Sequence, residues 1–240
     1  MDNKDDKKAS SKTQTFPKEK PEKRTEASDS ERSNPDSPLQ RFAKSMKIDY
    51  EKWHDGIGYD LNAIKLASPT ERKEIEQMLI QHRPRDWRDI EALAEIDSED
   101  AKKTIRNSVK DPNFEVQVAV ARYSPNLIKN KERTHSIVEA LAHAELYGCL
   151  SQVLDEIEDY HPKEVEKALI TGLMNREGEA AVLFAAMLFY LHGKAKEPFD
   201  MNQRSFFLRF NTENRKERIL VFRELCKQLN INPEQYLKLR

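Results

Sequence analysis

The residues best suited to metal chemistry are His135, Glu139 and His143, which follow one another at intervals of four. On a helix this spacing puts the three side chains in one column, and imidazole and carboxylate groups are common ligands of divalent metals. His135 and His143 are two turns apart, however, about 12 Å by helical rise, which is too far for one ion. We therefore expect a solvated polar stripe with no metal and no other cofactor.

The two cysteines, Cys149 and Cys226, do not suggest nucleophilic catalysis. The position of Cys149, at the start of a helical segment, is typical of a small buried thiol. Two lone cysteines provide neither a disulfide framework nor a paired metal spacing. The sequence contains no phosphate-binding glycine loop and no nucleophile elbow. We identify no catalytic residue and expect a protein without enzymatic activity.

An acidic run at residues 154–159 indicates instead a surface for a basic partner. If Val153, Leu154 and Ile157 face the core, four carboxylates remain on the exposed side of the helix: Asp155, Glu156, Glu158 and Asp159. Like charges on neighbouring turns repel one another slightly, and a basic partner would relieve that repulsion. The alternative is a solvated helix face without a specific role.

A second candidate contact lies in the phenylalanine-rich segment 199–210. Four rings within twelve residues must pack against something, and the helix predicted from Thr212 to Leu229 supplies a facing apolar stripe. We expect them to close the core at that end. The alternative is a groove that accepts a partner's side chain, with contacts from three residues: Phe199, Arg204 and Phe207.

Residues 82–88 group three arginines with Trp87, a combination found at phosphate-binding and protein-binding surfaces. Asp86 and Asp89 interrupt the basic charge, and Trp87 continues the apolar stripe of the following helix. We therefore interpret this segment as structural.

The elements that must position these residues are short helices, each opened by a capping residue and closed by a turn. No segment alternates with the period of a strand. Hairpins of such helices cannot bury their apolar stripes alone, so they are expected to stack and to present a surface for binding. Seven helical segments are predicted in the centre of the chain: Asp86–Asp97, Ser98–Lys110, Asn113–Tyr123, Lys131–Tyr147, Cys149–Tyr160, Pro162–Arg176 and Glu179–His192.

Residues 111–119, Asp-Pro-Asn-Phe-Glu-Val-Gln-Val-Ala, resemble the opening of a HEAT repeat, and the resemblance extends over about residues 69–193. The family usually has arginine after the first valine, where this chain has Gln117; Arg106 and Arg122 are nearby substitutes. The resemblance implies an all-α, HEAT-like stack of helical hairpins, an α-solenoid. Proteins of this kind include bacterial immunity proteins, adaptors, DNA glycosylases and pigment lyases, so the fold alone does not select a function.

The domain organisation follows from composition. Residues 1–40 are rich in charged residues and poor in apolar ones, and we expect a disordered tail. Residues 41–240 form the helical domain, with an N-terminal cap (41–84), repeats (85–193) and a C-terminal cap (194–240). Within the first cap, residues 50–61 carry two glycines beside Trp53 and two tyrosines. We interpret this stretch as a non-helical cap over the first hairpin, with a ligand loop as the alternative.

Net charge and hydropathy narrow the range of possible functions. The chain has 41 basic and 42 acidic residues, a balance that argues against a nucleic-acid partner. No apolar run approaches the roughly 20 residues needed to cross a bilayer, so we expect a cytoplasmic protein and no membrane contact. The predicted function is a non-catalytic protein-binding scaffold, a bacterial immunity-type or adaptor protein that binds and blocks a partner, for example a basic toxin. The sequence leaves the partner's identity and the oligomeric state open.

The alternative is a HEAT-like DNA glycosylase or another nucleic-acid-binding protein. Such an enzyme needs a basic surface, an aromatic pair that stacks on a base and a carboxylate between them. Trp53, Trp87, Asp86 and Arg88 are candidates for these roles. A pigment lyase of the same fold has no candidate residue here.

Overall fold

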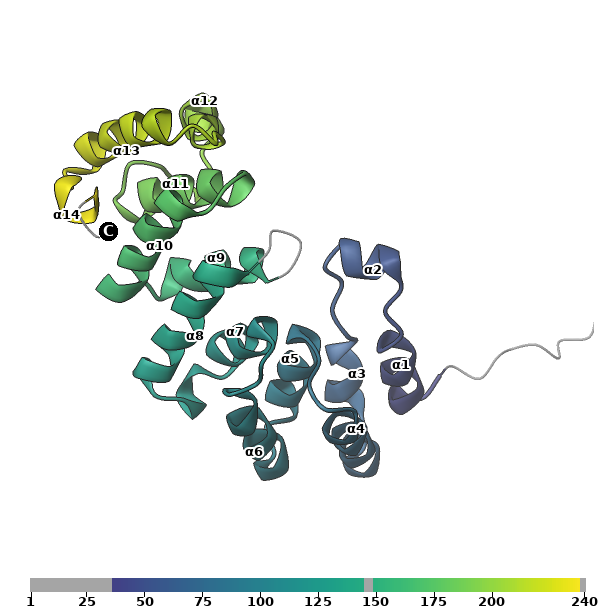
Figure 1. Ribbon diagram of the computed structural model, residues 1–240. Coiled ribbons are helices and arrows are strands. Elements are labelled where there is room, and N and C mark those ends of the chain that lie inside the picture. Colours follow the sequence, from purple (N-terminus) through teal and green to yellow (C-terminus); the bar gives the residue numbers. More distant parts are fainter. Residues whose placement is uncertain (1–35, 145–148, 238–240) are drawn as a thin grey trace, which may run out of the picture. The chain divides into compact units, whose positions relative to one another are not determined.

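The computed structural model describes residues 36–144 and 149–237 (Figure 1). Every regular element within these residues is a helix, which confirms the prediction of an all-α chain. The α-helices of the first half are α1 (Pro38–Ser45), α2 (Tyr50–His54), α3 (Leu61–Leu66), α4 (Pro69–His82), α5 (Trp87–Ile96), α6 (Glu99–Ser108) and α7 (Phe114–Tyr123). Those of the second half are α8 (Asn130–His143), α9 (Leu150–Asp159), α10 (Lys163–Asn175), α11 (Glu179–Leu191), α12 (Arg204–Phe207), α13 (Arg215–Leu229) and α14 (Glu234–Leu237). Three short 3-10 helices are η1 (Pro125–Leu127), η2 (Met201–Gln203) and η3 (Leu208–Phe210).

The seven helical segments predicted in the centre of the chain correspond to α5 to α11. The segment predicted to end at Tyr147 ends earlier, because α8 stops at His143 and Ala144 is extended; residues 145–147 lie outside the described residues.

The starts of α5, α6 and α7 follow from local capping, whereas no side-chain hydrogen bond from the described residues caps α9, α10 or α11. The side chains of Asp86, Ser98 and Asn113 accept hydrogen bonds from backbone N–H groups in the first turns of α5, α6 and α7. Ser68 and Glu71 form a capping box at the start of α4. These caps satisfy amide groups that have no carbonyl partner within the helix.

Helices that are close in sequence also lie against one another in space (Figure 1). α5 contacts α3, α4, α6 and α7, whereas α7 contacts α8 and α9. α10 contacts α8, α11 and α13. Contacts thus join α5 to α7 and α7 to α9, although α6 and α8 separate these helices in sequence.

Two hydrophobic clusters form the interior, and α7 contributes to both. Val116, Ala119 and Val120 belong to the cluster that also includes α1, α3, α4, α5 and α6. Val118 belongs to the cluster formed with α8 to α13. All four of these α7 side chains have no exposed surface. The small apolar residues of the Asp-Pro segment therefore let neighbouring helices approach α7 from two sides.

Buried or half-buried arginines tie helix ends to neighbouring segments. Arg72 of α4 donates to the end of α5, Arg176 donates to the end of α8, and Arg218 of α13 donates to the end of α10. A guanidinium satisfies carbonyl groups that lack a partner at a helix C-terminus and faces the negative end of the helix dipole. The accepting carbonyl groups are those of Glu95 and Ile96 for Arg72, Leu141 and Ala144 for Arg176, and Met174 and Arg176 for Arg218.

Gln117, which stands where the resemblance leads us to expect arginine, donates from Nε2 to the backbone oxygen of Asp111 at 2.6 Å. Of the two substitutes named from the sequence, Arg106 is exposed. Arg122 pairs with Asp155 of α9, with 2.8 Å between Nη1 and Oδ2. Only Arg122 therefore links two helices.

The N-terminal part of the described chain departs from the sequence-based description in one respect. Residues 50–54 form the short helix α2, because the Asp49 side chain accepts a hydrogen bond from the backbone of Lys52 and caps the first turn. The expected non-helical segment is thus shorter than predicted. α1 begins at Pro38 behind a capping box at Ser37, so the boundary predicted after residue 40 falls inside this helix. The tail predicted at residues 1–40 lies outside the described residues up to residue 35.

The phenylalanines of segment 199–210 pack as the predicted closing cap. Phe206, Phe207 and Phe210 are buried, and Phe199 is half-buried. The ring centroid of Phe207 lies 5.5 Å from that of Phe189 in α11 and 5.8 Å from that of Phe199. α13 completes this end, since Phe222 and Leu225 belong to the same cluster.

Candidate functional site

The acidic run on α9 is only partly exposed. Asp155 and Asp159 are exposed, and Glu158 is half-buried. The Glu156 side chain is only 4% exposed and pairs with Arg133 of α8, with 2.6 Å between Oε1 and Nη2. The prediction that all four carboxylates face solvent is therefore wrong for Glu156. The physical reason is that α8 packs against α9 on this side and brings a guanidinium into contact with the carboxylate.

The second predicted contact surface is also smaller than expected. The Phe207 ring has no exposed surface and cannot be offered to a partner, because the rings of Phe189, Phe199 and Phe206 pack around it. Phe199 is half-buried against Phe207, and Arg204 is exposed. Of the three residues named for a partner groove, only Arg204 remains freely accessible.

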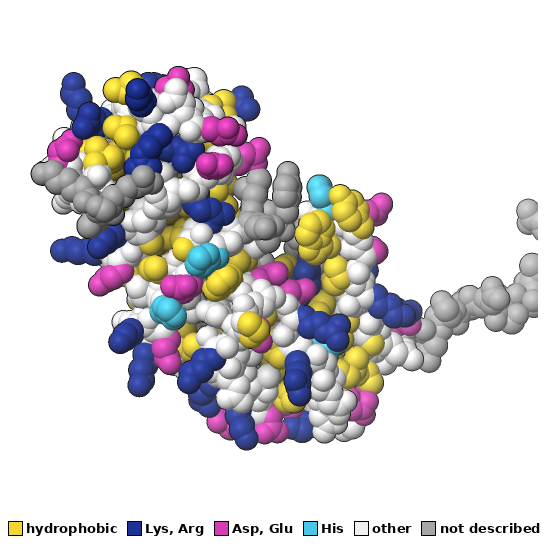
Figure 2. Space-filling view, in the orientation of Figure 1, with side chains coloured by type: hydrophobic (Ala, Val, Ile, Leu, Met, Phe, Trp, Pro, Cys, Tyr) yellow, Lys and Arg dark blue, Asp and Glu magenta, His cyan; other side chains and the backbone are white. Residues whose placement is uncertain are grey.

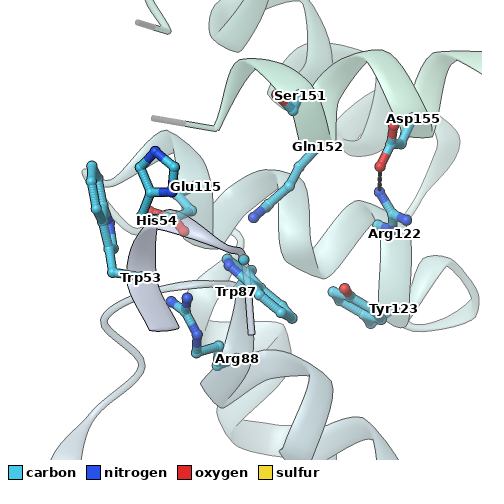
Figure 3. Close-up of a pocket in the computed structure, with 11 residues that line it drawn as sticks. Trp53, His54, Trp87, Arg88, Glu115, Arg122, Tyr123, Ser151, Gln152 and Asp155 are labelled. Atoms are coloured by element: carbon cyan, nitrogen blue, oxygen red, sulfur yellow. Dashed lines mark hydrogen bonds and ion pairs between the residues drawn. The ribbon is translucent and has the colours of Figure 1, made fainter. Parts of the chain in front are cut away.

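The main candidate site is a cavity of about 480 Å³ that four segments of the chain line (Figure 3). α2 and the loop after it form one wall, and α5, α7 and α9 form the rest. Figure 2 shows hydrophobic side chains gathered over α2, beside this cavity. The lining residues are Trp53, His54, Gly56, Trp87, Arg88, Glu115, Arg122, Tyr123, Ser151, Gln152 and Asp155. We call this cavity the aromatic pocket.

Three aromatic rings give the pocket its name. Trp87 and Tyr123 are stacked, with 6.4 Å between their centroids and 20° between their planes. Trp53 faces the cavity from α2 and is 48% exposed. Burial raises the pKa of Tyr123 to about 12, and its hydroxyl interacts with the Glu91 carboxylate behind the pocket. The Tyr123 hydroxyl therefore stays protonated at neutral pH and acts as a hydrogen-bond donor.

Both arginines of the pocket are already held by carboxylates. Arg88 is 2% exposed; its Nη1 lies 3.0 Å from Asp86 Oδ2, and its Nε donates to the backbone oxygen of Ile57 at 2.7 Å. The Arg88 guanidinium also lies 4.8 Å from the centroid of the Trp87 ring. Arg122 forms the ion pair with Asp155 that is drawn in Figure 3. Each positive charge is thus largely neutralised within the protein.

Glu115 and Gln152 differ from the two arginines, because among the described residues Glu115 has no ion-pair partner and the Gln152 oxygen has no hydrogen-bond donor. Burial raises the pKa of Glu115, which accepts hydrogen bonds from the Trp87 backbone and the Gln152 side chain. No cation lies within ion-pair distance of Glu115 in the described part of the chain, although Arg88 is near enough to favour its charged form. The Gln152 side-chain oxygen is buried without a hydrogen-bond donor. If the amide oxygen and nitrogen of Gln152 exchanged places, the oxygen would face the Glu115 carboxylate, and two acceptors would repel each other. The amide nitrogen is therefore assigned to the side that faces Glu115.

The loop after α2 packs directly on α5. A Cβ at Gly58 would lie 3.3 Å from both the Trp87 ring and the Glu91 carboxylate, so any other residue would require these side chains to shift. Gly56 adopts a φ of +64°, which also favours glycine. The two glycines noted in the sequence thus bring Trp53 to the edge of the pocket.

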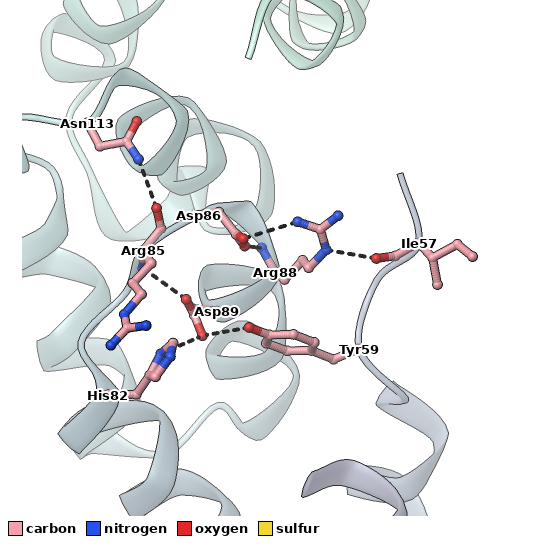
Figure 4. Close-up of polar contacts among 8 residues, drawn as sticks. All are labelled: Ile57, Tyr59, His82, Arg85, Asp86, Arg88, Asp89 and Asn113. Carbon is pink, nitrogen blue, oxygen red and sulfur yellow. Dashed lines mark hydrogen bonds and ion pairs between the residues drawn. The ribbon is translucent and has the colours of Figure 1, made fainter. Parts of the chain in front are cut away.

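A buried hydrogen-bond network fixes the start of α5 behind the pocket (Figure 4). The fully buried Asp89 carboxylate accepts hydrogen bonds from the Tyr59 hydroxyl at 3.2 Å and from the Arg85 backbone at 2.9 Å. His82 Nδ1 lies 3.4 Å from the same carboxylate, and Asn113 donates to the Arg85 carbonyl at 2.8 Å. The network joins α4, α5 and the loop before α7, and so it positions Trp87 and Arg88.

Sequence reasoning named part of this pocket and missed the rest. Trp53, Trp87 and Arg88, proposed for the glycosylase alternative, all line it, and Asp86 lies behind it as the partner of Arg88. Asp155 lines it from the acidic run. Glu115, Tyr123 and Gln152 were not foreseen, because no local pattern links residues that are tens of positions apart.

The described residues offer no cluster for metal binding, and the two cysteine thiols are buried. Within residues 36–144 and 149–237, no group of three or more His, Cys, Asp or Glu side chains could hold a metal ion. Glu139 and His143 lie 3.9 Å apart on the surface of α8. Burial raises the pKa of the Cys149 thiol and of the Cys226 thiol to about 11.

Neither thiol is expected to react with a thiol reagent such as Ellman's reagent at pH 8 in the folded protein. The thiolate is the reactive form, and a pKa near 11 keeps Cys149 and Cys226 protonated at that pH. Both thiols should react within minutes after unfolding in denaturant, which serves as the control. Rapid stoichiometric labelling of the native protein at pH 8 would contradict the buried positions of the two cysteines.

No protein-family model matches the chain, and no curated protein or solved structure is similar to it either. Among the described helices, none is both long enough and apolar enough to cross a membrane.

Proposed function

We propose that this chain is a non-catalytic protein-binding scaffold that acts as an immunity-type or adaptor protein by covering a surface of its partner. The observation that carries the proposal is the aromatic pocket. It combines two tryptophans, a tyrosine and two arginines, the residue types that dominate the energetic centres of protein–protein interfaces. Its polar groups hold one another in place and include no nucleophile paired with a base.

The charges around the pocket favour a basic partner. Arg88 and Arg122 are neutralised by Asp86 and Asp155, whereas Glu158 and Asp159 continue the acidic surface along α9. Electrostatic complementarity of this kind accelerates association and selects the partner. Glu156 plays no part in this contact, because it is buried against Arg133.

The proposed scaffold is a HEAT-like series of helical hairpins. Support comes from the Asp-Pro turn before α7, the small residues of α7 and the pairing of successive helices along the chain. A scaffold of this type exposes extended surfaces and is commonly used to hold another macromolecule.

The test is to capture the partner with the purified full chain from native extract, with two single variants in parallel. Trp53→Ala removes the exposed ring of the pocket, and Leu220→Ala removes an exposed apolar side chain of α13 outside it. We expect one protein to be enriched by the wild type and by Leu220→Ala, and at least tenfold less by Trp53→Ala. Equal recovery by all three proteins would contradict a binding role of the pocket.

A second candidate function is binding and base excision of DNA, since Trp53, Trp87 and Arg88 share a pocket with the Glu115 carboxylate. Two aromatic rings and a carboxylate could hold an extruded base. Against this function, both pocket arginines are already paired, so little free positive charge remains for phosphate groups. Tight binding to duplex DNA that weakens steeply with salt, together with release of a base, would favour it over the protein-binding proposal.

A further inference from the structure

We infer that the aromatic pocket binds an arginine side chain of the partner protein, with the guanidinium against Trp53 and its N–H groups directed to the Glu115 carboxylate. This inference rests on the proposed protein-binding function and deepens it by naming the chemical group that the pocket recognises. Four steps support it.

First, the pocket offers a carboxylate that has no cation partner among the described residues. Glu115 lines the cavity and accepts hydrogen bonds from neutral groups, but it forms no ion pair in the described part of the chain. Removing a carboxylate from water without a counter-charge costs free energy, which a cationic ligand that donates to it recovers.

Second, the pocket favours a ligand group with a positive charge. A carboxylate removed from water is stabilised when a cation comes close to it, and the pKa of Glu115 is raised chiefly by burial. An anion would have to compete with Asp86 for Arg88 or with Asp155 for Arg122, and it would also face Glu115. The pocket therefore selects against phosphate and carboxylate groups.

Third, the aromatic rings suit a flat cation. Aromatic faces attract cations, and tryptophan attracts them most strongly. The protein already places Arg88 over Trp87 and Arg122 near Tyr123. Trp53 contacts Tyr50 and has no arginine of its own over its ring in the described residues, while almost half of its surface is exposed. Trp53 is the ring available to a cation from a partner.

Fourth, a guanidinium fits this set of groups better than an ammonium. It is planar, stacks on a tryptophan and carries five N–H donors in a fixed arrangement. One guanidinium can donate two N–H groups to the Glu115 carboxylate while its plane lies on the Trp53 ring, whereas a lysine ammonium is a compact charge that does not stack.

The test uses the intrinsic fluorescence of the full chain, because its only two tryptophans, Trp53 and Trp87, both line the pocket. The probes are the peptides acetyl-Ala-Arg-Ala-amide and acetyl-Ala-citrulline-Ala-amide, which have nearly the same shape but differ in charge. We expect a saturable change in fluorescence with the arginine peptide and at least tenfold weaker binding of the citrulline peptide. Absence of saturable binding of the arginine peptide, or equal binding of both peptides, would overturn the inference.

Two variants separate the pocket from general electrostatic attraction. Glu115→Gln keeps the shape of the side chain and should weaken binding of the arginine peptide at least tenfold, with the melting temperature nearly unchanged. Glu213→Gln removes an exposed carboxylate outside the pocket and should leave binding unchanged. Equal losses in both variants would show that the peptide binds through net charge, which contradicts the inference.

The inference and the proposed function fail in different ways. If Trp53→Ala loses the captured partner but the arginine peptide does not bind, the pocket binds a protein through another group, and only the inference is wrong. If a duplex oligonucleotide changes the tryptophan fluorescence at lower concentration than the peptide and the extract yields no protein partner, both are wrong.

Discussion

Replacing Glu156 by lysine is expected to lower the free energy of unfolding by about 3–5 kcal/mol, because it puts two positive charges together in a buried site. The Glu156 side chain is 4% exposed and that of Arg133 is 18% exposed, so little water can screen the repulsion. For a chain of this size the loss corresponds to a fall in melting temperature of roughly 10 °C. Thermal unfolding followed by circular dichroism at 222 nm measures it.

Asp159→Lys on the same helix is the matched control for this change. Asp159 is exposed, and exposed charges contribute little to stability, so its reversal should leave the melting temperature within about 1 °C. The melting temperature of Glu156→Gln should fall between those of Glu156→Lys and Asp159→Lys, because the amide oxygen can still accept a hydrogen bond from Arg133. Equal stability of Glu156→Lys and Asp159→Lys would contradict the buried ion pair.

Replacing Arg218 by methionine is expected to lower the free energy of unfolding by about 3 kcal/mol or more, since hydrogen bonds from charged donors contribute roughly 1.5–3 kcal/mol each. Arg218 is 6% exposed and donates to the backbone oxygens of Met174, Arg176 and Thr212. Methionine retains much of the apolar stem but leaves these carbonyl groups without a donor. Because Arg218 joins α13 to the end of α10, hydrogen exchange should increase first in these two helices.

Arg215→Met provides the control for Arg218→Met. Arg215 is exposed in the first turn of α13, and its replacement by methionine changes the net charge by the same amount as Arg218→Met. Chemical unfolding in urea should give a midpoint close to that of the wild type for Arg215→Met and a clearly lower one for Arg218→Met. Arg218→Lys should also be destabilised, because one ammonium group does not reach three carbonyl groups in the geometry of a guanidinium.

The two predictions concern an ion pair and hydrogen bonds that connect different helices, and the aromatic pocket likewise depends on contacts between helices. Trp53 and Asp155 are about a hundred positions apart, yet both line it. The pocket exists because α5 contacts α7 and α7 contacts α9, while Gly58 lets the loop after α2 pack against Trp87. Any substitution that moves one of these helices is therefore expected to alter binding without touching the ligand.

Because their signals are local, the sequence by itself determined most of the helices, though not α2. Capping residues such as Ser68, Asp86 and Ser98 bond to the backbone within their own turns, and apolar residues at helical spacing define the buried face. The packing of the phenylalanine-rich segment was predictable for the same reason, since large rings must be buried wherever the chain places them.

Only the tertiary structure decided which polar side chains remain accessible. Asp155 and Glu156 are adjacent and chemically alike, yet one lines the pocket and the other is buried, because α8 brings Arg133 to one side of α9. Glu115, Gln152 and Trp53 come together through helix contacts that leave no periodic trace in the sequence. The exposure of a charged residue and the composition of a pocket depend on neighbours from other helices, and the packing of those helices is a property of the whole fold.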